Sequence, residues 1–187
     1  PGFAPLTFLG NHDTTRIASQ LADGRDLAAA IALLALLPGI PAVYAGDELG
    51  AVGVKEDRPG GDDAVRPPFP EFPLGAENTL AVLKPEASER ILEAHRRLLG
   101  LRRRHPWLAT ARAGIDEDTL SNTWAQIDLS GQGEHDGEHL QLVLNLDDEA
   151  HPAPGEVLDA VAGADMIDGV GPAEPGTIPA HGIAVIG

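Results

Sequence analysis

Apolar runs set the pattern of the first part of the chain. Residues 6–9 and 40–44 are short apolar runs of the kind that fill strands buried on both faces of a parallel sheet. Between them, residues 25–37 are apolar nearly all round, which predicts a helix wedged between neighbours. An aspartate can cap its start, and a proline and a glycine end it. The order strand, helix, strand predicts two parallel strands joined by a right-handed crossover.

A second helix and a series of strands are predicted further along. Residues 85–104 carry an apolar stripe, with glutamates near the start and arginines at the end, which favours an amphipathic helix. From about residue 107 the pattern changes to alternation and polar turns. The strand candidates are residues 121–129, 140–146 and 182–186, and together they predict a small antiparallel β-sandwich with few or no helices.

The composition narrows the classes of function. The chain has 187 residues and a formal net charge of −16, which argues against nucleic-acid binding because that needs a basic face. An acidic surface suits a neutral ligand such as a glucan, although solubility is the simpler explanation. No apolar run reaches the ~18 residues that a membrane-spanning helix needs, so we expect no membrane partner. Cysteine is absent, and the compartment stays open, with the cytoplasm favoured over secretion.

Polar residues follow the first apolar run directly. Asn11, His12 and Asp13 stand where the strand gives way to its loop, which in βα-barrels is the edge that carries the chemistry. A carboxylate beside an imidazole can bind vicinal sugar hydroxyls and can stabilise an oxocarbenium-like centre through its negative charge. The alternative is that Asp13 only caps the following turn or helix and that His12 is a solvated loop residue.

A second motif follows the second apolar run, with the residues Gly39, Pro41, Tyr44, Gly46 and Glu48. The two motifs, in this order and with one helix-length segment between them, resemble the last two active-site motifs of the α-amylase family of glycoside hydrolases (family 13). Adjacent residues at a strand exit point in opposite directions. We therefore expect a structural role for the second motif, with Glu48 binding loop backbone rather than forming an acid/base pair with Asp47.

The resemblance implies roles for the first motif. Asp13 matches the third catalytic carboxylate of the family, the transition-state stabiliser, which holds sugar hydroxyls and keeps the pKa of the acid raised. His12 would hydrogen-bond the same sugar, and Asn11 would belong to the substrate site. Arg16 would orient the loop or reach a neighbouring subsite, with a surface salt bridge as the alternative.

A loop later in the chain also resembles a family segment, though loosely. Arg66 begins a stretch that is similar to a loop of oligosaccharide-acting members, with Phe69 in place of a methionine and Glu71 in place of a tryptophan. The resemblance makes Arg66 a candidate substrate-binding residue.

The likeness spans almost the whole chain and implies its architecture. The fold class would be α/β plus all-β: the C-terminal portion of a (β/α)8 TIM barrel in residues 1–106, followed by a small antiparallel β-sandwich domain in residues 107–187. In the family the nucleophile and the acid/base lie on earlier strands, so the chain would be a fragment that is inactive alone. A barrel cut open in this way exposes strand edges, from which we expect self-association.

The function implied is that of a retaining α-glycosidase acting on α-glucans or on malto- and isomalto-oligosaccharides. A glucosyltransferase or a trehalose-synthase-like isomerase of the same family is the close alternative. A non-catalytic carbohydrate-binding module made of the sandwich ranks lower. Such modules display aromatic side chains, and the only ones in the sandwich region are Trp107 and Trp124.

An acidic stretch raises the question of a metal. Residues 52–75 are rich in proline, glycine and aspartate without periodicity, which predicts a long loop. Calcium is conceivable there, but the spacing of the acidic residues does not follow an EF-hand loop, and we expect no cofactor and no metal site. The acidic residues in question are Glu56, Asp57, Asp62 and Asp63.

Overall fold

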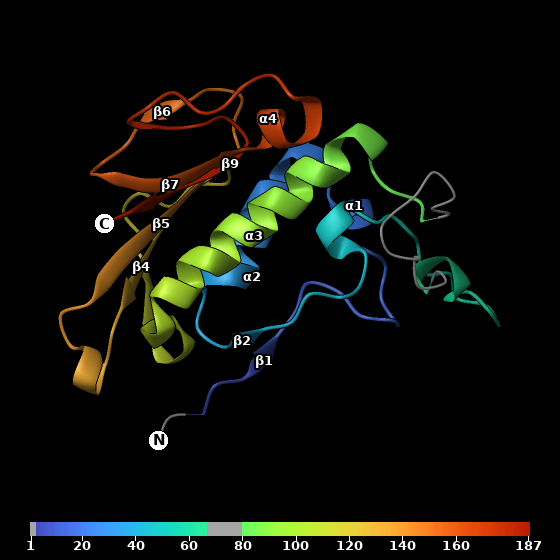
Figure 1. Cartoon of the computed structure of the whole chain (residues 1–187), viewed down its shortest axis with the longest axis horizontal. Coiled ribbons are helices and arrows are strands. Elements are labelled where there is room, and N and C mark those ends of the chain that lie inside the picture. Colours follow the sequence, from blue (N-terminus) through green and yellow to red (C-terminus); the bar gives the residue numbers. More distant parts are fainter. Residues whose placement is uncertain (1–2, 67–79) are drawn as a thin grey trace.

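The computed structural model of the chain describes residues 3–66 and 80–187 (Figure 1). Phe69 and Glu71 lie outside the described residues. The helix α2 (Leu27–Leu36) lies between a pair of short strands and a five-stranded sheet, and it packs along the longer helix α3 (Ser88–Arg104). None of the helices in the described part of the chain is long and apolar enough to cross a membrane.

The short strands are β1 (Leu6–Thr7) and β2 (Ile40–Pro41). They pair in parallel, with Leu6 opposite Ile40, so the predicted parallel pair is confirmed. The prediction that these runs form strands buried on both faces is wrong in length and in burial, because Leu6 is 62% exposed and Ile40 is 52% exposed. In the described structure each strand pairs only with the other. The second edge of each strand is therefore unpaired, and the side chains of Leu6 and Ile40 are exposed.

The helix predicted over residues 25–37 is confirmed, with a tighter first turn. Asp23 caps the 3₁₀ turn η1 (Gly24–Asp26) by accepting a hydrogen bond from the backbone N–H of Arg25 at 2.8 Å. All but one residue of α2 is buried, as expected from its apolar composition. The chain leaves α2 through Gly39, whose φ of +126° only glycine adopts readily. A Cβ at this position would lie 2.7 Å from Thr7 Cγ2, so the residue also permits the close approach of β1.

The amphipathic helix predicted over residues 85–104 is also confirmed, with its first turn as the 3₁₀ segment η4 (Pro85–Ala87). Its buried face is formed by Ile91, Ala94, His95, Leu98 and Leu101. At its C-terminal end Arg102 donates hydrogen bonds to the carbonyl oxygens of Ala35 and Leu37, at 2.8 and 2.9 Å. These are carbonyls at the end of α2, so one guanidinium ties the two helix ends together.

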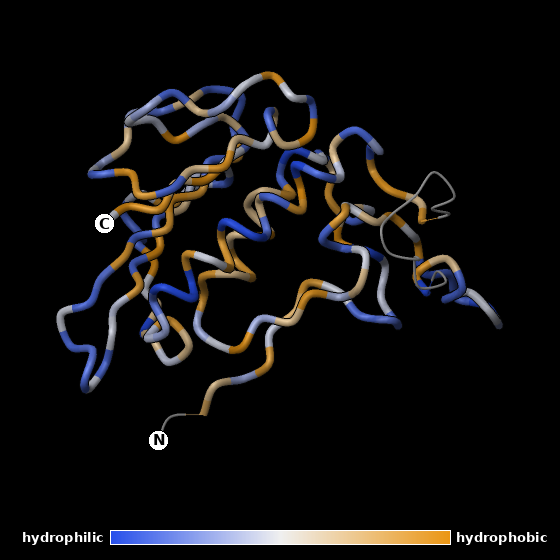
Figure 2. Tube along the Cα trace, in the orientation of Figure 1, coloured by the Kyte–Doolittle hydropathy of each residue, from blue (hydrophilic) through white to orange (hydrophobic). Residues whose placement is uncertain are grey.

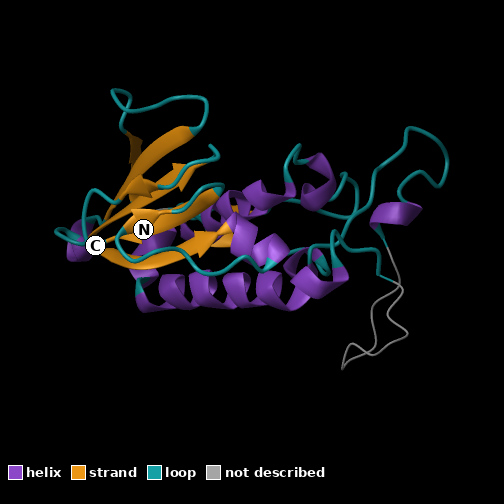
Figure 3. Ribbon diagram, turned by 90° about the horizontal axis from the view of Figure 1, so that it is seen from above, coloured by secondary structure: helices purple, strands orange, loops and turns teal. Residues whose placement is uncertain are grey.

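The sheet is antiparallel, with the strand order β3-β4-β5-β9-β7. Successive residues of β5 and β9 point to opposite faces. One face packs on α2 and α3, and the other is covered by a two-stranded antiparallel sheet of β6 and β8. Figure 2 shows hydrophobic residues along the central strands, and Figure 3 shows α3 running along one side of the sheet. The strands are β3 (Arg112–Ile115), β4 (Trp124–Ser130), β5 (His139–Asn145), β6 (His151–Pro152), β7 (Val157–Ala162), β8 (Thr177–Ile178) and β9 (Gly182–Ile186).

The hydrophobic core continues across the expected domain boundary near residue 106. Buried residues of α2 and α3 and of the strands β4, β5, β7 and β9 belong to one cluster. The division into a barrel part and a sandwich part therefore remains a proposal. The remaining elements are short: α1 (Ile17–Gln20), η2 (Asp47–Leu49), η3 (Asp63–Val65), η5 (Pro106–Thr110), η6 (Gly133–His135) and α4 (Gly163–Asp168).

Candidate functional site

The loop after β1 presents the first motif to solvent. Asn11 shapes the loop, because its side-chain oxygen accepts a hydrogen bond from the backbone N–H of Asp13 at 2.8 Å. His12 Nε2 lies 3.2 Å from Asp13 Oδ2, and the side chains of these two residues are 63% and 56% exposed. Both groups are therefore accessible to a ligand that approaches this edge.

Arg66 reaches this loop from far along the chain. Its NH2 group lies 2.5 Å from Asp13 Oδ1, and its Nε donates to the backbone carbonyl of His12 at 2.8 Å. The hydrogen bond from Arg66 lowers the pKa of Asp13, helped by the charges of His12 and Lys55 and opposed by partial burial. Asp13 is thus held as an anion. The structure brings together three of the predicted site residues, namely His12, Asp13 and Arg66.

Arg16 faces inward, unlike the rest of the first motif. Its side chain is 1% exposed, and NH1 donates to Asp47 Oδ1 at 2.7 Å and to the carbonyl of Ala45 at 2.9 Å. The guanidinium also lies over the ring of Tyr44, 4.0 Å from its centre. The alternative of a surface salt bridge is therefore wrong: the pair is buried. Arg16 joins the loop after β1 to the loop after β2.

Sequence reasoning weighed Asp47 only as an acid/base partner of Glu48 and missed its pairing with Arg16. Its side chain is 5% exposed. Burial raises the pKa of its carboxyl group, although the hydrogen bond and the charge of Arg16 act in the opposite direction. A Cβ added to Gly10 would lie 3.3 Å from Asp47 Oδ2, so the carboxylate also packs against the backbone at Gly10, just after β1. Nothing in the spacing of Arg16 and Asp47 along the chain indicated that they pair.

The second motif forms a tight turn after β2. Glu48 Oε2 accepts a hydrogen bond from the backbone N–H of Gly46 at 2.8 Å, a contact of the kind expected for a structural role. The hydroxyl of Tyr44 donates to the carbonyl of Val65 at 3.2 Å, which ties this turn to the segment that carries Arg66. Gly46 has a φ of +98°, which lets the chain reverse here. Pro41 lies in β2 itself.

The acidic loop makes ion pairs of its own. Glu56 pairs with Arg58, and Asp62 Oδ2 lies 2.5 Å from Arg66. In the parts of the chain that the structure describes, no group of three or more histidine or acidic side chains is arranged to hold a metal ion.

Comparison with known proteins places these loops in a family. A model of the alpha amylase catalytic domain matches residues 3–143. A 4-alpha-glucanotransferase from Thermotoga maritima is 39% identical over 70 residues, which cover 36% of this chain and 15% of that protein.

Solved structures resemble the chain along nearly its whole length. An alpha-amylase from H. orenii matches 98% of this chain and 39% of its own with a TM-score of 0.66 and 23% identity. The trehalulose synthase MutB from Pseudomonas mesoacidophila MX-45 matches 97% of this chain and 42% of its own with a TM-score of 0.69 and 18% identity. The chain thus spans less than half of each of these proteins. The likeness shows that the fold is related to that of α-amylase TIM-barrel proteins.

Proposed function

Because this chain belongs to the α-amylase family, we propose that it supplies the transition-state-stabilising side of a retaining α-glycosidase site. The substrates would be α-glucans or malto- and isomalto-oligosaccharides. The observation that carries the proposal is the exposed carboxylate of Asp13 beside His12 and Arg66 at the carboxyl edge of the parallel strands. A fixed anion at this edge can stabilise the positive charge that develops on the sugar ring.

The neighbouring residues have distinct parts in this proposal. His12 and Arg66 are the donors that face Asp13. When substrate displaces their contacts with Asp13, each can donate to a sugar hydroxyl instead. Asn11 belongs to the same substrate-binding loop and shapes it. Of the two roles left open for Arg16, its burial favours orienting the loop over reaching a subsite.

Asp13 alone does not make a glycosidase. A retaining mechanism needs a nucleophile and an acid/base whose carboxyl groups lie about 5 Å apart. Of two other carboxylates at this edge, Asp47 is 5% exposed and out of reach of a sugar, and Asp62 shares the guanidinium of Arg66 with Asp13. We therefore propose that the nucleophile and the acid/base are supplied from outside this chain, and that the chain is inactive alone.

The exposed flank of the strand pair supports the same view. Phe8 is half-exposed beside Leu6 and Ile40. A groove of about 400 Å³ lies between the loop after β2 and α3, with Val43, Ala45, Leu92 and Leu99 among its lining residues. Apolar surface of this kind drives association. In isolation the chain is therefore expected to associate with itself through this flank.

A transferase or isomerase activity is the second candidate. The local identity to a 4-alpha-glucanotransferase favours it, since that protein is named for transferring rather than hydrolysing. The two reactions share Asp13 in the same role and differ in whether water or a sugar hydroxyl attacks the intermediate.

The purified 187-residue chain is expected to show no turnover of an aryl α-glucoside. Turnover by the chain, free of host enzymes, would contradict the assignment of nucleophile and acid/base to another segment.

In a longer protein that carries this chain together with those two carboxylates, Asp13→Asn should lower kcat/KM by several orders of magnitude and leave the fold intact. Asp57→Asn is the matched control, because it removes a carboxylate from the acidic loop. Near-normal turnover of Asp13→Asn would show that Asp13 is only a loop residue.

A further inference from the structure

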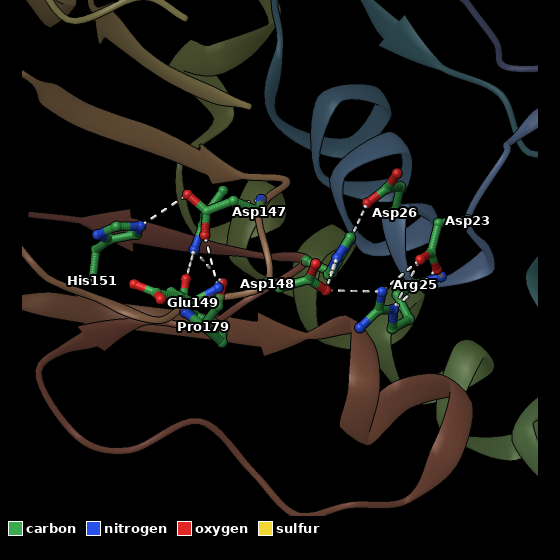
Figure 4. Close-up of polar contacts among 10 residues, drawn as sticks. Asp23, Arg25, Asp26, Asp147, Asp148, Glu149, His151 and Pro179 are labelled. Atoms are coloured by element: carbon green, nitrogen blue, oxygen red, sulfur yellow. Dashed lines mark hydrogen bonds and ion pairs between the residues drawn. The ribbon is translucent and has the colours of Figure 1, made fainter. Parts of the chain in front are cut away.

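His181 directly precedes β9 and lies where three segments that are distant in sequence meet. Its Nδ1 is 2.7 Å from Asp26 Oδ1, at the start of α2, and its Nε2 is 3.0 Å from Asp148 Oδ1, in the loop after β5. Figure 4 shows Asp26 and Asp148 facing one another across this junction. The imidazole is buried, at 9% exposure, and it connects the helix of the first half to the sheet of the second.

The geometry fixes the protonation state of this ring. Ionised carboxylates only accept hydrogen bonds, whereas a neutral imidazole has one N–H donor and one lone pair. With a carboxylate oxygen at hydrogen-bond distance from each ring nitrogen, both nitrogens must donate. Both contacts therefore exist together only when His181 is an imidazolium cation.

The backbone of His181 is held in an uncommon conformation. Its φ of +44° is the only positive φ of a non-glycine residue in the described part of the chain. A positive φ is uncommon outside glycine, and histidine is one of the few residues, with asparagine and aspartate, that adopt it more readily. The backbone is nevertheless held, because its N–H donates to the carbonyl of Asp147 at 3.1 Å and its carbonyl accepts from Gly163 at 3.0 Å. A Cβ on Gly163 would lie 2.2 Å from that carbonyl oxygen, so the packing is close.

The charged groups around the ring favour its cationic form. From η1 come Asp26 and Arg25, and Arg25 is itself bound to Asp23 and to Asp148, at 2.7 and 3.2 Å. Burial by itself would lower the pKa of His181, and the charge of Arg25 acts in the same direction. The hydrogen bonds to the two carboxylates outweigh both, and the pKa is raised.

The loop after β5 and the neighbouring strand β6 supply the remaining charged groups near His181. Asp147 lies in that loop and pairs with His151 of β6, at 2.9 Å. At the start of α4 it is the backbone of Gly163 that contacts His181.

We propose that His181 is a pH-dependent latch that fastens the start of α2 to the loop after β5. The latch is closed while the ring carries its proton and opens when the proton is lost, because one ring nitrogen then turns a lone pair toward a carboxylate. The helix that it holds links the two loops of the candidate site. Opening therefore loosens the support of that site without touching it.

The sign of the effect follows from the raised pKa of His181. The stabilisation is fully present below the ordinary histidine pKa of about 6.5 and is lost as the pH rises through the higher pKa of the folded state. Loss of stability as the pH rises above about 6.5 is therefore the signature of the latch.

Urea unfolding of the whole chain from about pH 5.5 to pH 9 tests the proposal, with His181→Asn as the main variant. Asparagine tolerates a positive φ and carries no charge. The urea midpoint of the unaltered chain should fall as the pH rises through this range, and that fall should vanish in His181→Asn. Asp148→Asn, at a carboxylate whose side chain is 82% exposed, should shrink it. His139→Asn removes an exposed histidine 3.4 Å from one carboxylate and should leave it unchanged.

Nitrogen NMR of the His181 ring gives a readout that does not depend on any variant folding. At pH 6 both ring nitrogens should carry a proton, and the pKa should lie above 6.5. A ring that is neutral at pH 6 would overturn the latch. So would a His181→Asn variant that keeps the full loss of stability with rising pH.

Discussion

At the edge of the molecule that carries both loops, a buried and an exposed arginine–aspartate pair can be compared. Arg16 and Asp47 are 1% and 5% exposed and lie 2.7 Å apart, while Arg66 and Asp13 are 44% and 56% exposed and lie 2.5 Å apart. The chemistry of the two contacts is the same. Water screens the outer pair and leaves it open to exchange for a ligand, whereas the inner pair is fixed by its surroundings.

The difference assigns opposite tasks to the two pairs. An exposed ion pair contributes little to stability, so its atoms are free to serve binding or catalysis. A buried pair is costly to break, because either partner left alone is an uncompensated charge out of water. The inner pair therefore sets the relative position of the two loops, and the outer pair is what a sugar would meet.

Removing one partner of the inner pair is the strongest test of this comparison. Arg16→Ala leaves the Asp47 carboxylate buried without its partner and is expected to lower the free energy of unfolding by about 3–5 kcal/mol. Arg66→Ala is the matched control and should cost less than about 1 kcal/mol. Urea unfolding of both variants at neutral pH measures the difference. Equal losses in the two variants would mean that burial does not distinguish the pairs.

The acid side of neutrality sharpens the same test. Burial already raises the pKa of Asp47, and without Arg16 its carboxyl group should take up a proton more readily still. A protonated carboxyl carries no charge to compensate. The cost of Arg16→Ala should therefore shrink as the pH is lowered toward 5, while that of Arg66→Ala stays small throughout.

A smaller effect on stability is expected at Gly10, which lies against the buried Asp47 carboxylate. In Gly10→Ala the new methyl group would lie 3.3 Å from Asp47 Oδ2, which is tighter than usual packing. We expect a loss of about 1 kcal/mol in unfolding free energy, from the small shift that the carboxylate must make. Gly114→Ala, in a strand where a Cβ meets nothing within 4 Å, is the control. A loss in Gly10→Ala no larger than in the control would show that the contact is slack.

The sequence predicts much of the fold, because most elements follow hydrophobic periodicity. The buried helix α2, the amphipathic helix α3 and the strand at residues 182–186 were all expected from their patterns. It did not predict β3 or β7, which lie at the two edges of the sheet and alternate poorly. The length of β1 and β2 was overestimated, because an apolar run does not tell how many neighbours a strand will find.

Of the candidate site, sequence reasoning located the loops but not the contacts between them. The order of polar residues after the first apolar run placed Asn11, His12 and Asp13 in a loop after a strand, and in the structure they lie in the loop after β1. That Arg16 turns inward to Asp47 depends on how the crossover helix brings the two loops together, and a local pattern carries no information about it. The sequence analysis did not predict the contact between Arg66 and Asp13, but it named both residues as candidates for binding the same substrate.

The smallest and most direct measurement separates the two aspartates by their titration. Hydrogen bonding to Arg66 lowers the pKa of Asp13 below its ordinary 3.8, and burial raises that of Asp47 above it. The stability contributed by Asp13 is therefore present above its ordinary pKa and lost as the pH falls through the lower value. Protonation of Asp47 comes earlier during acidification and relieves the cost of a buried charge.

Carbon NMR of the two carboxyl groups should place their midpoints on opposite sides of 3.8. Arg66→Ala should return the midpoint of Asp13 toward that value and leave the midpoint of Asp47 where it was. Midpoints on the same side would remove the distinction between a pair that serves the ligand and a pair that serves the fold.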